Sequence, residues 1–173
     1  LMQKLEPGDE LVFHEGTYGD VFRLLRSGLP EKPITIRGYG CGEKRPVIDF
    51  WLRTAPIEIY ASNMILDYFE FITHREGNLV HIRGGGPDRR SDNITISNCV
   101  LRDSPSVVID CNTPGVKCNN LKILNNVFLG INYTCIYIGN HSGVSPASNV
   151  LIEGNFIDVS RVNYWYIVVY GMF

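Results

Sequence analysis

Six residues of the chain carry side chains that can do chemistry, and they lie in short apolar segments that resemble one another. An imidazole can accept a proton, a guanidinium can stabilise negative charge, and carboxylate oxygens can bind calcium. A tyrosine ring offers a flat surface on which a sugar ring can rest. The six candidates are Glu58, Tyr60, His81, Arg83, Asp110 and Tyr137. They form one site only if the fold places their segments side by side.

The elements that would position these residues follow from a repeated phrase. It begins with Asn at position 93, and it returns from Asn120 and from Asn149, with a looser copy from Asn63. The starting positions are 27 to 30 residues apart, which indicates one structural unit repeated with small loop insertions. The chain is therefore predicted to be a solenoid, in which each unit buries its neighbour.

Each repeat contains three short apolar alternations bounded by turn-forming residues, which predict three strands. The predicted first strands are 64–66, 94–96, 121–123 and 150–152, the second strands are 69–71, 99–101, 126–128 and 155–157, and the third strands are 80–82, 107–109, 136–138 and 167–169. An earlier turn is predicted from 34–36, 47–48 and 57–59, preceded by a strand at 11–13. The predicted fold class is all-β, a single-stranded parallel β-helix of about five coils in one domain spanning residues 1–173.

Like strands of successive coils stack at about 4.8 Å, so outward residues form straight columns. On the third strand, aligning the repeats predicts one column of Glu58, His81, Val108, Tyr137 and Val168. The next row is predicted to contain Tyr60, Arg83, Asp110, Gly139 and Tyr170. This alignment places Glu58 beside His81, and Arg83 beside Asp110.

Two further columns are predicted near the first strand. The corner after it aligns Phe69, Cys99, Asn126 and Asn155, and inward Asn side chains there can satisfy backbone groups that the strands leave unpaired. An outward column contains Arg37, Asp67, Ser97, Leu124 and Glu153. We interpret the first column as structural and the second as an exposed ladder of polar pairs.

The opening segments carry a resemblance to a known family. Residues 5–13 read LEPGDELVF and are followed by EGTY at 15–18, and residues 33–38 read PITIRG. Together with the stacked Asn corners, this pattern resembles the right-handed parallel β-helix proteins of the pectate-lyase-like superfamily. Lyases, hydrolases, epimerases and uncharacterised surface proteins share it. The right-handed sense is implied by the resemblance and by the general rule for parallel crossovers.

The resemblance implies an extracellular domain, polysaccharide lyase-like, that acts on or binds an acidic polysaccharide. The resembling lyases remove a proton next to a uronate carboxylate while a cation, often calcium, neutralises that carboxylate. On this interpretation His81 is the base and Arg83 supplies positive charge, while Glu58 and Asp110 hold calcium. Tyr60 and Tyr137 would contact the sugar. The alternative is that Glu58 with His81 and Arg83 with Asp110 are surface ion pairs of little energetic value.

The ends of the chain suggest a second class of function. The chain enters almost directly on its first strand, and residues 164–173 (YWYIVVYGMF) form an apolar, aromatic strand with no cap after it. An uncovered solenoid end favours edge-to-edge association. The chain is thus expected to be a fragment of a longer protein or a module that stacks on another copy. The corresponding function is a non-catalytic structural or adhesive module of a larger surface protein or filament.

The composition excludes some partners. A formal net charge of −2 gives no electrostatic reason to expect nucleic acid. No apolar run approaches the length of a membrane span, and no cleavable signal peptide is evident. The Gly84–Pro87 run lacks the Lys and Ser/Thr of a phosphate-binding loop. Solvated loops are the expected setting of Arg89 with Arg90, of residues 74–76 and of His141.

Cysteines and glycosylation signals favour an extracellular location. The five cysteines, which lack the spacing of a zinc site, are Cys41, Cys99, Cys111, Cys118 and Cys135. The Asn112–Gly115 turn could fold Cys111 back on Cys118, but the sequence leaves the pairing open. Acceptor sequons occur at Asn93, Asn132 and Asn140.

Overall fold

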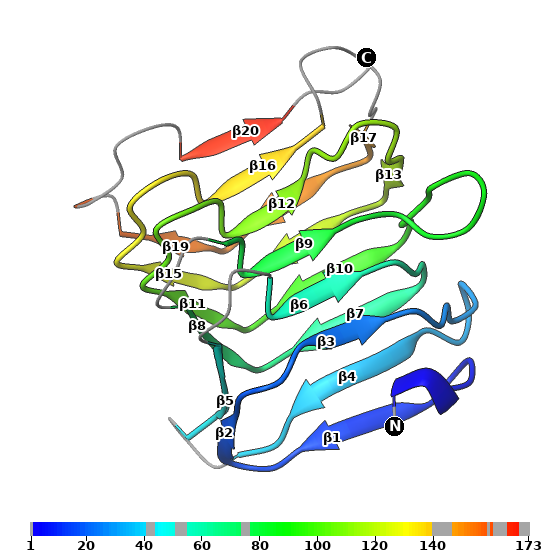
Figure 1. The fold of residues 1–173 in the computed structure, drawn as a ribbon, viewed down its shortest axis with the longest axis horizontal. Helices are drawn as coiled ribbons and strands as arrows, with labels where there is room; N and C mark the ends of the chain where they lie inside the picture. The colour runs from blue at the N-terminus through cyan, green and yellow to red at the C-terminus, as the bar shows by residue number, and fades with distance from the viewer. Residues whose placement is uncertain are drawn as a thin grey trace.

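A computed structural model describes residues 2–40, 44–50, 55–73, 77–139, 147–158, 160 and 166–169. The chain coils into a parallel β-solenoid with three sheets, and the helical part of the described residues is the short 3₁₀ turn η1, Met2–Lys4 (Figure 1). The predicted all-β solenoid is therefore confirmed. Residues 1, 41–43, 51–54, 74–76, 140–146, 159, 161–165 and 170–173 lie outside the described residues, so the expectations for Cys41, residues 74–76, Asn140, His141 and Tyr170 stay untested.

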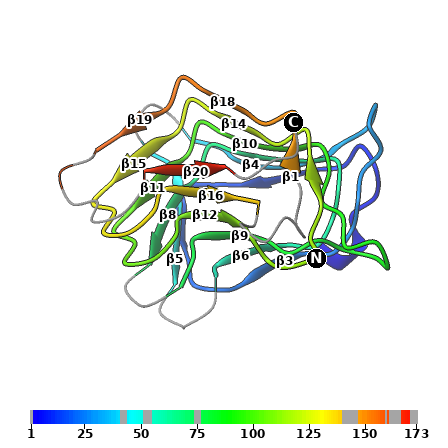
Figure 2. The ribbon, with the colours of Figure 1, turned by 90° about the horizontal axis from the view of Figure 1, so that it is seen from above.

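The three sheets are the three sides of the coil, as the view from above shows (Figure 2). The first sheet contains β1 (Glu10–Phe13), β4 (Ile34–Gly38), β7 (Met64–Asp67), β10 (Ile94–Ser97), β14 (Lys122–Leu124) and β18 (Leu151–Glu153). The second contains β2 (Gly16–Tyr18), β5 (Pro46–Phe50), β8 (Glu70–Thr73), β11 (Val100–Arg102), β15 (Val127–Leu129) and β19 (Phe156–Ile157). The third contains β3 (Phe22–Leu24), β6 (Ile57–Ile59), β9 (Val80–Ile82), β12 (Ile109–Cys111), β16 (Ile136–Ile138) and β20 (Ile167–Val169). A small fourth sheet pairs β13 (Cys118–Asn119) with β17 (Ala147–Ser148).

Each main sheet has six strands, which agrees with the predicted stack of about five coils preceded by one strand. In the first coil, β2 and β3 accompany β1, which corresponds to the predicted strand at 11–13. The pairing is parallel throughout the main sheets, for example between β7 and β10. Each coil is thus the crossover that parallel pairing requires.

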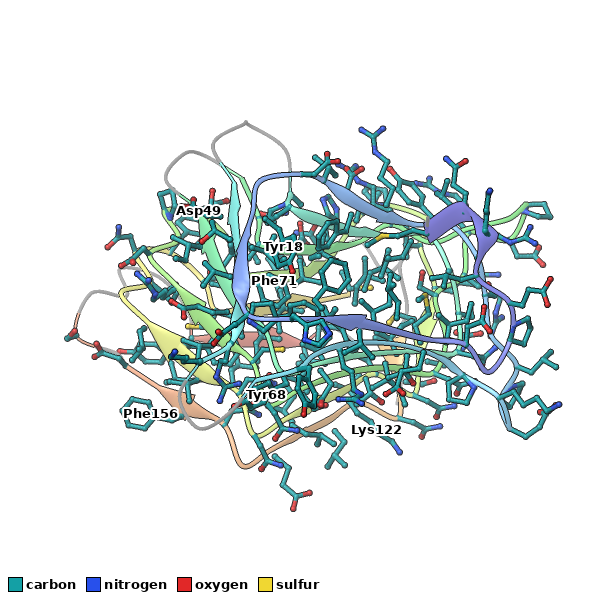
Figure 3. All side chains as sticks on the ribbon, turned by 90° about the horizontal axis from the view of Figure 1, so that it is seen from below. Tyr18, Asp49, Tyr68, Phe71, Lys122 and Phe156 are labelled. Atoms are coloured by element: carbon teal, nitrogen blue, oxygen red, sulfur yellow. The ribbon has the colours of Figure 1, made fainter. Side chains whose placement is uncertain are left out.

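Alternation along each strand sorts the side chains. Ile34, Met64 and Ile94 of the first sheet are in register and fully buried or nearly so. Figure 3 shows Phe71 inside the coil and Phe156 pointing out of it. Stacking these apolar rows is the main source of stability, since burying a large apolar side chain contributes about 1.5–3 kcal/mol.

Two asparagine ladders hold the corners. At the corner that precedes the first-sheet strands, called the outer corner below, Asn63, Asn93 and Asn120 all have φ near +56°. Asn tolerates this conformation better than most residues. The amide of Asn93 donates to Asn63 over 2.6 Å and that of Asn120 donates to Asn93 over 2.7 Å. At the corner that follows the first-sheet strands, called the inner corner below, the Asn126 side chain accepts from the Cys99 N–H and donates to the Ile96 carbonyl. The predicted structural role of the Asn corner is confirmed.

One predicted strand is displaced by two residues, whereas several others differ from the prediction by one residue at an end. The sequence predicted a third strand at 107–109, but β12 is Ile109–Cys111, and Asp110 lies opposite His81 instead of Val108. Val107, Ile109 and Cys111 are all apolar and buried, so a shift of two residues keeps the same inward alternation. Only a shift of one residue would have turned the apolar side chains outward.

Candidate functional site

The outward column of the third sheet brings most of the candidate residues together. The register places Arg23, Glu58, His81, Asp110 and Tyr137 in line across β3, β6, β9, β12 and β16 (Figure 1). Each residue is the middle of its three-residue strand, so its neighbours point inward and it points outward. This column, with Arg83 at the end of β9, is called the third-sheet column below.

Glu58 is held between two arginines. Its side chain is 4% exposed, and its Oε2 accepts from Arg23 Nε over 2.8 Å. Its Oε1 accepts from Arg83 over 3.1 Å. Arg23 and Arg83 are more exposed, at 61% and 34% of their side chains. The carboxylate is therefore neutralised from both sides, and the guanidiniums face solvent.

His81 is a neutral imidazole at pH 7. Its Nε2 lies 2.8 Å from Thr113 Oγ1 and 3.6 Å from Asp110 Oδ2, and the side chain is 13% exposed. Burial, together with the charge of Arg83, lowers the pKa of His81 to about 4, although the charge of Glu58 opposes the shift. Its contact with Asp110 is consequently not an ion pair at neutral pH, and the imidazole is in the form that accepts protons.

Asp110 is shifted in the opposite direction. Burial raises the pKa of Asp110 to about 6, although hydrogen bonds from Asn112 and Asn78 and the charge of Arg83 oppose the rise. Its Oδ1 accepts from the Asn112 N–H over 3.0 Å, and its Oδ2 accepts from the Asn78 amide. At pH 7 Asp110 is mostly ionised, and it loses its charge under mildly acidic conditions.

The loop after β12 places Thr113 on His81. Gly115 has a φ of 82°, and the Val116 N–H donates to the Thr113 carbonyl over 3.1 Å. Pro followed by Gly at the centre of such a turn is typical of type II, because Pro presets φ and Gly accepts a positive φ. Arg89 Nη1 donates to the Pro114 carbonyl over 2.9 Å, which ties the loop to the preceding coil.

The structure agrees with the predicted site in part. Glu58 lies beside His81 as predicted, and it also contacts Arg83. The predicted pairing of Arg83 with Asp110 is wrong in register, because the shift of β12 moves Asp110 next to His81. The contacts of Arg23 with Glu58, Asn78 with Asp110 and Thr113 with His81 were not predicted from the sequence. The Pro114–Gly115 turn was the available signal for Thr113.

The two tyrosines flank the column. Tyr60 directly follows β6, and its N–H donates to the Leu24 carbonyl over 2.9 Å. Tyr137 lies in register with Asp110 on β16. Both are partly exposed. Three strand spacings separate their strands, about 14 Å along the stack.

The carboxylates do not fit the predicted calcium site. Glu58 and Asp110 are two strands apart, about 10 Å along the stack, whereas calcium takes its oxygen ligands at 2.3–2.6 Å. Both oxygens of Glu58 are already engaged by arginines. Among the residues that the structure describes, no group of three or more His, Cys, Asp or Glu side chains could hold a metal ion.

The predicted polar column of the first sheet is confirmed in register, from Arg37 through Asp67 and Ser97 to Leu124 and Glu153. Arg37 forms an ion pair with Glu10, and Ser97 Oγ donates to Asp67 over 2.6 Å. These polar side chains pair with neighbours on adjacent strands, which agrees with the interpretation of the column as a ladder of pairs. No helix in the described part of the chain is long and apolar enough to cross a membrane.

No family model and no curated protein sequence matches the chain. Among solved structures, it is similar to an alginate lyase from Paenibacillus sp. str. FPU-7, with 14% identity and a TM-score of 0.44, over 98% of this chain and 70% of that one. It is also similar to a mutant of the PL6 family alginate lyase AlyGC, with 14% identity and a TM-score of 0.36, over 99% of this chain and 37% of that one.

Proposed function

We propose that the chain is an extracellular, polysaccharide lyase-like β-helix domain that acts on an acidic polysaccharide bound across the third-sheet column. The observation that carries the proposal is that His81 and the partly exposed Arg83 both lie against Glu58 on the third sheet, His81 by its register and Arg83 by its ion pair. A proton acceptor and a positive charge on one face are what an elimination next to a carboxylate requires.

The reaction would use this chain's own side chains as follows. Arg83 binds the carboxylate of a uronate residue and stabilises the charge that develops as the neighbouring C–H bond breaks. The imidazole of His81 takes that proton. The electron pair of the C–H bond forms a C=C bond, the glycosidic C–O bond breaks, and the leaving oxygen takes a proton from water.

The tyrosines support a polymeric substrate. Tyr60 and Tyr137 lie too far apart along the stack to contact one sugar ring, but they can contact separate sugars of one chain. Aromatic faces of this kind are suited to the apolar faces of sugars. The substrate class is therefore proposed to be an acidic polysaccharide that spans several coils, with Arg83 and His81 near the middle.

Ultraviolet absorbance of the unsaturated uronate product tests this proposal, with pectate, alginate and glycosaminoglycans as substrates. Arg83→Ala is expected to abolish the signal. Arg102→Ala is a matched control, because Arg102 is 37% exposed and pairs with Glu70 on the second sheet, away from the column. No product with any substrate, or equal loss in both variants, would reject a lyase site at Arg83.

A second candidate function is a non-catalytic structural module that stacks on another copy. Ile167 and Val169 lie in register with the buried Ile136 and Ile138, yet they are 42% and 44% exposed. At the other end, a hollow of about 620 Å³ is lined by apolar side chains that include Leu11, Phe13 and Phe22. Sedimentation velocity decides this alternative: a mass that grows with concentration supports stacking, and a concentration-independent monomer rejects it.

A further inference from the structure

Two cysteines flank the loop that carries Thr113, one at each end of it. Cys111 is the last residue of β12, and Cys118 is the first residue of β13. Each side chain is about 1% exposed. The loop between them therefore leaves the core at one thiol and returns to it at the other.

Both thiols are free and buried, and their side chains interact with each other. A hydrogen bond with the Cys118 thiol is the main reason that the pKa of Cys111 lies well above its ordinary value, and burial adds to the rise. The other described cysteines are in different settings. The Cys99 thiol donates to the Ser97 carbonyl, and burial alone raises the pKa of Cys135 to about 11.

The loop is folded so that its two ends stay together. The Thr113–Val116 turn reverses the chain, and the Lys117 N–H donates to the Arg89 carbonyl over 2.9 Å. The carbonyl of Lys117 accepts from the Ser91 N–H over 3.0 Å. These bonds hold the backbone next to Cys118 to the preceding coil.

We propose that Cys111 and Cys118 form an intramolecular disulfide when a small-molecule disulfide is present as oxidant. The thiolate of one cysteine attacks the small disulfide and releases one small thiol. The thiolate of the second cysteine then displaces the other small thiol, so that the protein loses two electrons and two protons and the oxidant gains them. Because both thiols are buried, this exchange takes place during folding or while the loop is open.

The crosslink would hold the Thr113 hydroxyl at His81. A disulfide restricts the loop that it closes in the unfolded chain, and here that loop carries the 2.8 Å contact between Thr113 and His81. The disulfide would consequently restrict the loop that contacts His81 of the third-sheet column. It depends on the loop geometry and not on the proposed lyase activity.

The test is peptide mapping by mass after the full chain is refolded with oxidised and reduced glutathione and its remaining thiols are alkylated. The expected crosslinked species joins Cys111 to Cys118, and its mass is 2 Da below that of the same segment with both thiols free, by the loss of two hydrogens. The thiols of Cys99 and Cys135 are expected to be alkylated. Pairing of Cys111 or Cys118 with any other cysteine, or five alkylated thiols, would overturn the proposal.

Two serine variants distinguish specific loss of the crosslink from a general effect of misfolding. Cys118→Ser should remove the crosslinked peptide, whereas Cys135→Ser, at an equally buried site, should leave it in place. The oxidised wild-type chain should melt about 5 °C above its reduced form, and this difference should vanish in Cys118→Ser. An equal difference in both variants would contradict the assigned pair.

Discussion

His81 and Asp110 lie in register on β9 and β12, with Nε2 3.6 Å from Oδ2. Burial lowers the pKa of His81 to about 4 and raises that of Asp110 to about 6. Between these values both groups are neutral. Under mildly acidic conditions, His81 and Asp110 are therefore two neutral, desolvated groups. At pH 7, a neutral imidazole lies beside a carboxylate.

The opposite shifts predict a flat dependence of stability on pH. Between about pH 4 and 6 the unfolded chain protonates His81 while the folded chain does not, so this group makes stability rise with pH. Over the same range the folded chain keeps Asp110 protonated while the unfolded chain does not, so this group makes stability fall with pH. Each contribution is on the order of 3 kcal/mol, and they nearly cancel.

Chemical unfolding of two variants from pH 4 to 6.5 measures the separate contributions. In His81→Gln, stability should fall as pH rises, because the Asp110 contribution remains. In Asp110→Asn, stability should rise with pH, because the His81 contribution remains. Parallel pH profiles for the two variants would show that the shifts are not opposite.

Neutralising the buried Glu58 is predicted to lower the free energy of unfolding more than neutralising the more exposed Glu70. Glu58→Gln should destabilise the chain by about 1–3 kcal/mol, because the buried side chain at position 58 loses its charge-assisted hydrogen bonds with two arginines. Glu70→Gln, which affects the more exposed pair with Arg102, should cost under about 1 kcal/mol. Urea unfolding at two salt concentrations checks both, and equal costs would mean that Glu58 is solvated as well as Glu70.

The inner asparagine ladder predicts a large effect at one position. Asn126→Ala would leave the Cys99 N–H and the Ile96 carbonyl without their partner at a buried corner. The expected loss is about 2–4 kcal/mol. Asn120→Ala, at the exposed end of the outer ladder, should cost less. Thermal unfolding of both variants makes the comparison, and a smaller cost at Asn126 would contradict it.

Two neighbouring glycines should respond differently to substitution. A Cβ at Gly85 would overlap the carbonyl oxygen of Tyr60, whereas a Cβ at Gly86 meets open space. Gly86→Ala should cost only about 1 kcal/mol, for its φ of 68°. Gly85→Ala should cost more and displace Tyr60, which thermal unfolding and tyrosine fluorescence would report. Equal effects of the two variants would show that the loop moves freely off Tyr60.

The sequons are predicted to differ in occupancy. Asn93 is part of the outer ladder, where its amide donates to Asn63, and a glycan on that nitrogen would disturb the ladder. Asn132 is exposed. On secretion from a eukaryotic host, peptide mass mapping should find glycan at Asn132 and little at Asn93. Full occupancy of Asn93 in folded protein would contradict the ladder.

The sequence by itself determined the solenoid and the inward or outward direction of most side chains. A repeat of 27 to 30 residues with three alternating segments permits few other arrangements, because apolar residues at period two must share one buried face. The adjacency of Glu58 and His81 followed from the same alignment and was confirmed. So was the Asn corner, since its residues recur at the same place in successive repeats.

Tertiary structure decided the register of β12 and the contacts that cross between loops. Alternation cannot distinguish a strand at 107–109 from one at 109–111, because both bury the same kind of side chain, and the choice moves Asp110 from Arg83 to His81. Arg23 reaches Glu58 across 35 residues, and Thr113 reaches His81 across 32. Such partners, like the contact between Cys111 and Cys118, depend on how loops of different length pack on the stack, and the periodic pattern carries no information on loop packing.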